Sequence, residues 1–158
     1  MRKFIVPFVW IIVFFSCSCT HRNYYHEIYP IHGEVWNIDS VLHFNIDIID
    51  SLQYFDFYID IRNNTDFETQ NFYIFLTSEF PNGYIGTDTL GFVICNPFGK
   101  WTGKGNSRIK ENRFTYKTNI RFSTTGTYKF SVLQGMRKNK VKGITDFGLC
   151  LTKSKNDH

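Results

Sequence analysis

The sequence predicts an all-β fold, a single β-sandwich of about eight strands in an immunoglobulin-like or jelly-roll arrangement, behind a signal peptide and a short tether. Two observations lead to this expectation. Apolar and polar residues alternate along most of the chain, with short turn signals between the alternating runs and no long helical stripe. Aromatic residues make up 18% of the sequence, including 17 Phe and 9 Tyr, and bulky rings pack well on a pleated sheet.

The first 16 residues have the layout of a signal peptide. Two basic residues precede an uncharged apolar run at 4–15. As a helix this run would reach only about 18 Å, too short for the roughly 30 Å hydrocarbon core of a bilayer. Ser16 then precedes Cys17, which resembles the lipobox of bacterial lipoproteins, whose cysteine is lipidated and becomes the first residue. Cys17 is therefore the predicted lipidation site, Cys19 is the alternative, and an ordinary secreted protein is the remaining interpretation.

Removal of the signal peptide changes the charge balance of the chain. About 142 residues remain, with 16 basic and 14 acidic side chains, so the mature net charge is only +2. This charge gives no reason to expect a nucleic-acid partner, and the length suits one domain with one core. We assign 1–16 to the signal peptide, 17–34 to the lipidated N-terminus and tether, 35–152 to the sandwich and 153–158 to a C-terminal tail.

The first predicted strands follow the tether. The tether shows no clean period and is expected to become an irregular or edge segment, with Trp36 as the first buried anchor. The runs 43–48 and 55–61 carry an apolar residue at every second position, as half-buried strands do. The run 71–80 is apolar on both faces for most of its length, which is typical of a central strand.

The remaining strands follow turn signals. A Pro-Asn-Gly turn precedes the run 84–95, and 113–122 shows the cleanest alternation in the chain. The turn Ser-Thr-Thr-Gly then leads into 127–135, a charged loop follows at 136–143, and 144–151 closes the fold. The basic residues of that loop are expected to be solvated, although near an anionic membrane they would help to orient the protein.

Several segments together resemble the gliding motility lipoprotein GldH family of Bacteroidetes. The resemblance covers about 35–152, and its most specific pieces, in order, are "RNNTDF", "FPNG", "TDTL", "GKWTGKG" and "LQGMR" followed by "GITDFGL". That family also begins with a lipoprotein signal, which favours Cys17. The resemblance implies a lipid-anchored, periplasm-facing envelope protein that works with other lipoproteins of the gliding and type IX secretion machinery. It implies no catalytic residues.

The residues capable of catalysis or metal binding form no recognisable arrangement. The spacing of the N-terminal histidines matches no ligand motif, and they lie in the tether: His21, His26 and His32. His43 is expected to face solvent from its strand, and Asp56 and Asp60 lie on the outward face of theirs. We therefore predict no enzyme, no catalytic residue, no metal, no small-molecule substrate and no cofactor apart from the covalent lipid.

One loop and one pair of cysteines leave alternatives open. Trp101 lies among basic residues that together make a candidate partner contact, namely Lys100, Lys104 and Arg108. Alternatively, Trp101 folds back and plugs the open end of the sandwich while the lysines stay solvated. Cys95 and Cys150 both lie in predicted strands, where they form a disulfide if their Cα atoms lie within about 7 Å, or else stay free as small buried hydrophobic residues.

Two functional classes remain. The leading one is a non-enzymatic lipoprotein of a motility or secretion apparatus, anchored in the cell envelope and contacting other envelope proteins. The alternative is a periplasmic or surface carbohydrate-binding module, supported only by the aromatic content. A strand face with several exposed Tyr or Trp in a row would favour the alternative, and inward aromatic side chains the first.

Overall fold

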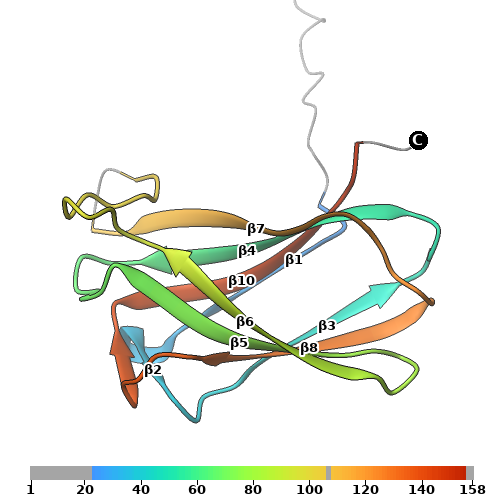
Figure 1. Ribbon diagram of the computed structural model, residues 1–158, viewed down its shortest axis with the longest axis horizontal. Helices are drawn as coiled ribbons and strands as arrows, with labels where there is room; N and C mark the ends of the chain where they lie inside the picture. Colours follow the sequence, from blue (N-terminus) through green and yellow to red (C-terminus); the bar gives the residue numbers. More distant parts are fainter. Residues whose placement is uncertain (1–22, 106–107, 156–158) are drawn as a thin grey trace, which may run out of the picture.

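The computed structural model describes residues 23–105 and 108–155 and places them in two packed antiparallel sheets (Figure 1). The first sheet has the order β1-β10-β4-β7, formed by Tyr25–Pro30, Ile144–Lys153, Tyr54–Asn63 and Lys110–Arg121. The second has the order β3-β8-β5-β6, formed by Leu42–Ile48, Gly126–Gln134, Asn71–Glu79 and Ile85–Val93. A short third sheet pairs β2 (Val35–Asn37) with β9 (Lys140–Lys142), and a 3₁₀ turn, η1, covers His32–Glu34. The predicted β-sandwich is confirmed.

The period-two pattern determines which side chains enter the core. In β4 every second residue from Phe55 to Ile61 is buried, and β3 buries Phe44, Ile46 and Ile48 in the same way. The inner face of β10 supplies Phe147, Leu149 and Leu151 to the same core. Because the side chains of both sheets alternate, one aromatic-rich core fills the space between them.

The described part of the chain has ten strands where about eight were expected. Three strands lie outside the runs predicted from the sequence: β2 and β9 have three residues each, and β1, with six, lies within the segment assigned to the tether. β1 pairs with β10 along its whole length, from Tyr25 opposite Leu151 to Pro30 opposite Asp146. The paired chain therefore begins before Val35, the expected start of the domain, and supplies the edge segment that the sequence suggested.

The edge strand β1 has an unusual inward face. Its inward positions are Tyr25, Glu27 and Tyr29, because these residues lie opposite inward residues of β10. Both tyrosine hydroxyls donate to the Glu27 carboxylate, Tyr29 at 2.7 Å. Burial and this hydrogen bond raise the pKa of Tyr25, and the hydrogen bond to Glu27 raises that of Tyr29. A carboxylate at an inward position hides the alternation, which explains why the sequence pattern did not show this strand.

The start of the described chain lies at one of the two ends of the sandwich. Tyr24 N donates to Leu151 O at 2.8 Å and Ser154 N donates to Tyr54 O at 2.9 Å, so residues 24 and 154 lie at the same end. We call this end, on the right in Figure 1, the proximal end; it includes the loops 49–53, 80–84 and 122–125. The opposite, distal end gathers η1 and the loops 64–70, 94–105 and 135–143.

A chain of aromatic contacts closes the proximal end. The rings of Tyr24 and Phe55 have centroids 4.9 Å apart, and those of Phe55 and Phe122 are 5.6 Å apart. The chain continues from Phe122 to Tyr128 at 4.7 Å. It ends on the β5–β6 turn, with Tyr128 and Phe80 at 5.1 Å and Phe80 and Tyr84 at 5.3 Å. Six rings thus connect the start of the described chain to a turn of the opposite sheet.

Candidate functional site at the distal end

A network of two buried amides and the Thr102 hydroxyl holds the distal end together. Asn112 Nδ2 donates to Asn63 Oδ1 at 3.1 Å, and Thr102 Oγ1 donates to Asn112 Oδ1 at 3.0 Å. Asn63 and Asn112 are both buried, on β4 and β7 respectively. Buried amides are costly unless they are hydrogen-bonded, so this network fixes the loop that carries Thr102 against the two strands.

A second, charged network lies beside the first. Arg108 donates to both carboxylate oxygens of Glu34 and, at 2.9 Å, to Asp66 Oδ2. Asn64 Nδ2 donates to the same Glu34 carboxylate at 2.7 Å. The hydrogen bonds from Arg108 hold the pKa of Glu34 below its usual value, and those same bonds raise the pKa of Arg108. The Arg108 side chain, considered from sequence as a partner contact, thus joins η1 to the β4–β5 loop within the chain.

Gly143 brings the 135–143 loop close to the β4–β5 loop. Its φ of +88° lies in the left-handed region, and a Cβ atom there would lie 2.3 Å from the backbone nitrogen of Phe67. Its carbonyl accepts from Asn64 N at 2.8 Å, and its amide donates to Glu34 O at 2.9 Å. Only glycine combines this conformation with such a close approach. Pieces of "RNNTDF", "GKWTGKG" and "GITDFGL" therefore meet at one end of the sandwich.

Trp101 lies at the base of the loop and not at its tip. It forms an isolated β-bridge with Cys95, and its half-buried side chain packs against the hydrophobic core. This arrangement matches the alternative in which Trp101 plugs the open end. Lys100 and Lys104, its expected neighbours in a contact surface, are both exposed.

The tip of the same loop carries an aromatic side chain that the sequence pattern did not indicate. Phe98 is 94% exposed. Asn96 Oδ1 accepts from Phe98 N at 3.0 Å and from Lys100 N at 2.9 Å, so one side chain closes the turn. Gly99 N also donates to Asn96 O at 3.0 Å. The turn therefore presents Phe98 on an ordered base.

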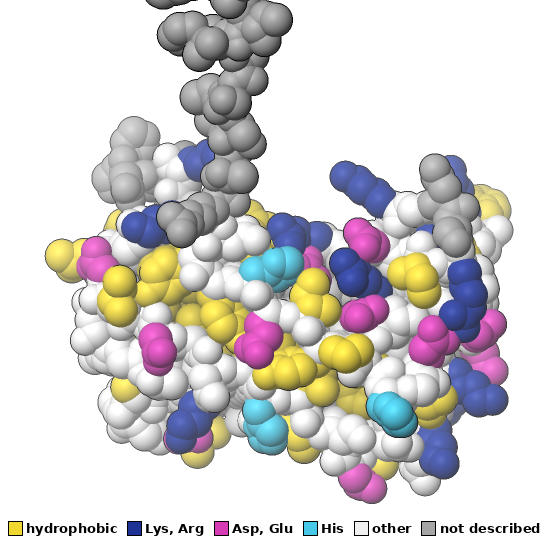
Figure 2. All heavy atoms as spheres, turned by 180° about the vertical axis from the view of Figure 1, so that it is seen from behind, with side chains coloured by type: hydrophobic (Ala, Val, Ile, Leu, Met, Phe, Trp, Pro, Cys, Tyr) yellow, Lys and Arg dark blue, Asp and Glu magenta, His cyan; other side chains and the backbone are white. Residues whose placement is uncertain are grey.

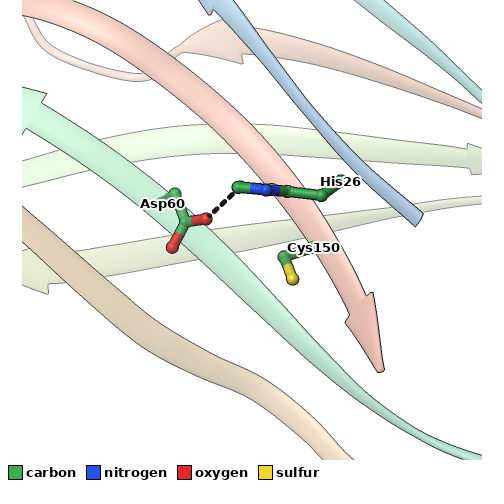
Figure 3. A group of neighbouring side chains, drawn as sticks. All are labelled: His26, Asp60 and Cys150. Atoms are coloured by element: carbon green, nitrogen blue, oxygen red, sulfur yellow. Dashed lines mark hydrogen bonds and ion pairs between the residues drawn. The ribbon is translucent and has the colours of Figure 1, made fainter. Parts of the chain in front are cut away.

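A cluster on the outer face of the first sheet brings together residues from three adjacent strands. His26 on β1, Asp60 on β4 and Cys150 on β10 have potential ligand atoms within 4.8 Å of one another (Figure 3). His26 Nε2 lies 2.9 Å from Asp60 Oδ2. His26 and Asp60 border an open hollow of about 500 Å³ that also reaches Thr102 and Glu111. The sequence spacing gave no signal for this cluster because it depends on the pairing of β1 with β10.

The surroundings of the cluster indicate an ion-pair network. Arg113 donates to both oxygens of Asp60 at 2.7 Å, so this carboxylate is already paired with a cation. Burial raises the pKa of the Cys150 thiol, which favours the protonated form over the thiolate that binds metal. Cys, His and Asp are the donor types of a zinc site, but a cation here would have to displace Arg113 and a proton. The described arrangement joins β1, β4 and β7 electrostatically.

The other residues considered for chemistry have ordinary partners. His43 Nδ1 lies 3.1 Å from Ser131 Oγ on the neighbouring strand, and Asp56 accepts from Asn119 N at 2.8 Å. Cys95 and Cys150 are free thiols, the first half-buried and the second buried, which matches the unpaired alternative. Among the described residues, His43, Asp56 and Cys95 form no nucleophile, base and orienting partner in mutual contact.

The exposed aromatic side chains on the second sheet do not form a row of Tyr or Trp. β5 exposes Tyr73 and Phe75, each at 42%. The Tyr73 ring lies over Gly91 of β6, where a Cβ atom would be 2.6 Å from Tyr73 Cε1. Most large rings point inward, which is the pattern that favours the first functional class over the carbohydrate-binding alternative.

Comparison with known proteins identifies the family. The profile described as "GldH lipoprotein" matches residues 23–151. The chain belongs to the GldH lipoprotein family. Within the described residues, no helix has both the length and the apolar character needed to cross a membrane. The predicted lipidation sites, Cys17 and Cys19, lie outside the described residues.

Two relatives extend this assignment along almost the whole chain. The protein is 38% identical over 156 residues to a "gliding motility lipoprotein GldH homolog" of Christiangramia forsetii, covering 94% of each chain. It is 30% identical over 138 residues to the "gliding motility lipoprotein GldH" of Flavobacterium johnsoniae, covering 83% of this chain and 85% of the other. Among solved structures it is similar to TmCBM61 in complex with β-1,4-galactotriose, at 12% identity and a TM-score of 0.38, over 84% of this chain and 99% of that one.

Proposed function

We propose that this GldH-family protein is a non-enzymatic, lipid-anchored component of the gliding motility and type IX secretion machinery, and that it acts through protein contacts on the periplasmic side. The observation that carries the proposal is the family match over residues 23–151, together with relatives named as gliding motility lipoproteins. The anchor is the lipid on Cys17, with Cys19 as the alternative, and no other cofactor takes part.

The distal end is the surface proposed to contact the partner. Its loops are fixed by the buried amide network and the Arg108 ion pairs, so binding a partner requires little ordering of the backbone. Phe98 stands exposed at the tip of an ordered turn, with Lys100 beside it and Lys104 further along the loop. An aromatic side chain with basic neighbours suits an apolar pocket with an acidic rim.

Gene deletion and complementation test this proposal. The deletion strain receives the wild type, a Cys17→Ser/Cys19→Ser form, Phe98→Ser, or Phe75→Ser as the matched control with an exposed phenylalanine on β5. Secretion, and gliding where the host glides, should be restored by the wild type and by Phe75→Ser. The other two forms should fail, because one lacks the anchor and the other the contact. Normal secretion and movement in the uncomplemented deletion strain would rule out a role in the machinery.

The site of the anchor is tested separately by the intact mass of the mature protein. We expect the lipid to be lost in Cys17→Ser and retained in Cys19→Ser. The opposite result would move the anchor to Cys19, and a wild-type chain without lipid would remove it altogether.

A further inference from the structure

We propose that the proximal end of the sandwich rests on the membrane that holds the lipid anchor, with apolar side chains of two loops entering the lipid–water interface. This inference rests on the proposed lipid anchoring and adds an orientation to it. The first sheet and the second sheet each contribute to this end, so the contact would involve the whole sandwich and not only the anchoring chain.

The first observation is the exposure of apolar side chains on the proximal loops. Ile49 is 80% exposed and Leu52 is 73% exposed, and both lie in the loop that connects β3 and β4. Tyr84 and Ile85, where the β5–β6 turn enters β6, are exposed at 61% and 62%. Apolar groups gathered on one part of a surface mark an interaction site, whereas scattered ones do not.

The second observation is that contacts tie both loops to the start of the described chain. Tyr24 Oη accepts from Ile49 N at 3.2 Å and donates to Asp47 O at 2.8 Å. The six-ring aromatic chain leads from Tyr24 to Tyr84 on the other loop. On the face shown in Figure 2, hydrophobic side chains run in a band from the left, which is the proximal end, across the centre, and most of the basic side chains lie toward the right.

The third observation is the length of chain between the anchor and the sandwich. From Cys17 to Asn23 there are six residue steps, which span at most about 20 Å when fully extended. The interface therefore lies within that distance of Asn23, and the loop that contacts Tyr24 is within its reach. So short a connection leaves little room for a protein partner between this end and the lipid headgroups.

The charged side chains at the proximal end also suit contact with a membrane surface. Lys153 and Lys155 are exposed where β10 ends, and Arg121 lies at the end of β7 with its guanidinium 5.6 Å from the centre of the Tyr54 ring. Basic and aromatic side chains together are the usual composition of a surface that sits at the level of the headgroups. Asp50 is the acidic residue of the β3–β4 loop, and it accepts from Leu52 N at 2.9 Å.

Quenching by brominated phospholipids tests the orientation directly. The mature lipoprotein, with its lipid confirmed by mass, is reconstituted into vesicles of brominated or ordinary phosphatidylcholine and phosphatidylglycerol. Tryptophan is introduced as Leu52→Trp, as Tyr84→Trp, or, for the matched control at the distal end, as Phe98→Trp. Trp36 and Trp101 are common to all variants and provide the baseline. For Leu52→Trp and Tyr84→Trp we expect blue-shifted tryptophan emission in ordinary vesicles and a strong loss of emission intensity in brominated ones. For Phe98→Trp we expect no change beyond the baseline.

The other outcomes overturn the inference. Unquenched proximal variants on a lipid-bearing, folded protein would show that these loops stay in water, while the anchor and the machinery role would remain. Equal quenching of all three variants would mean that the domain has no fixed orientation. A blue shift of the proximal variants without quenching in the brominated vesicles would place these side chains against protein, such as a second copy of the chain, instead of lipid.

Discussion

The two ends of this sandwich are closed in different ways. The proximal end is closed by six aromatic rings in edge-to-face and tilted contacts, and the distal end by hydrogen-bonded amides and ion pairs from loops far apart in the sequence. Aromatic contacts tolerate small shifts because ring pairs keep their attraction over a range of angles. A buried amide needs a partner at a fixed distance. The distal end is therefore the more tightly specified of the two, which suits a surface that must match a partner.

The largest effect is expected from breaking the aromatic end. Phe55 is fully buried and contacts both Tyr24 and Phe122, so Phe55→Ala should lower the free energy of unfolding by about 3–5 kcal/mol. Phe75→Ala, at an exposed position on β5, should cost less than about 1 kcal/mol. Urea unfolding of both variants measures the difference. Equal losses would mean that the aromatic layer contributes no more than a surface ring.

A smaller loss is expected from breaking the amide network. Asn112→Ala leaves Asn63 Oδ1 without its donor in a buried place, and this should cost about 1–3 kcal/mol. The exposed Asn45→Ala on β3 is the control and should be nearly neutral. If Asn112→Ala unfolds at the same urea concentration as the control, the network does not hold the loops.

The ion pair of Arg108 should give a small, pH-dependent effect. Because the pKa of Glu34 is lowered in the folded protein, its contribution is fully present above the ordinary value of 4.5 and is lost as the pH falls through the lowered value. The wild type should therefore exceed Arg108→Gln in stability at neutral pH, and this difference should shrink on acidification. Lys100→Gln should show no such dependence. Urea midpoints measured from pH 7 down to pH 3 check the sign.

The smallest effect on stability is expected at Phe98. Because this side chain is 94% exposed, Phe98→Ser should change the free energy of unfolding by no more than about 0.5 kcal/mol. Function in the complementation assay should nevertheless be lost. A stable variant with full function would show that the distal contact lies elsewhere.

The sequence was sufficient to predict the sandwich but only part of the distal end. Alternation identified β3, β4 and β7 because runs of their inward residues are apolar or aromatic, with the amides of Asn63 and Asn112 only at the distal ends of β4 and β7, whereas Glu27 in the middle of β1 concealed that strand. The segments that carry the family resemblance indicated where to look. Which side chains pair with one another at the distal end did not follow from these segments. Glu34 and Arg108, for example, are 74 residues apart and meet only in the folded chain. Phe98 was missed because sequence does not show which aromatic residue of a loop turns inward, and here that residue is Trp101.

The Glu27 carboxylate also bears on how this protein tolerates crowding. A lipid-anchored protein diffuses in two dimensions, where neighbouring copies meet often and with similar orientation. β1 is an edge strand whose free backbone groups offer a place for a strand of another copy to pair. Such pairing would further remove the Glu27 carboxylate and its two tyrosine partners from water. The loss of carboxylate solvation has an electrostatic cost that an edge strand with only apolar inward residues lacks. The inward acid on this edge strand therefore disfavours pairing between the sheets of two copies.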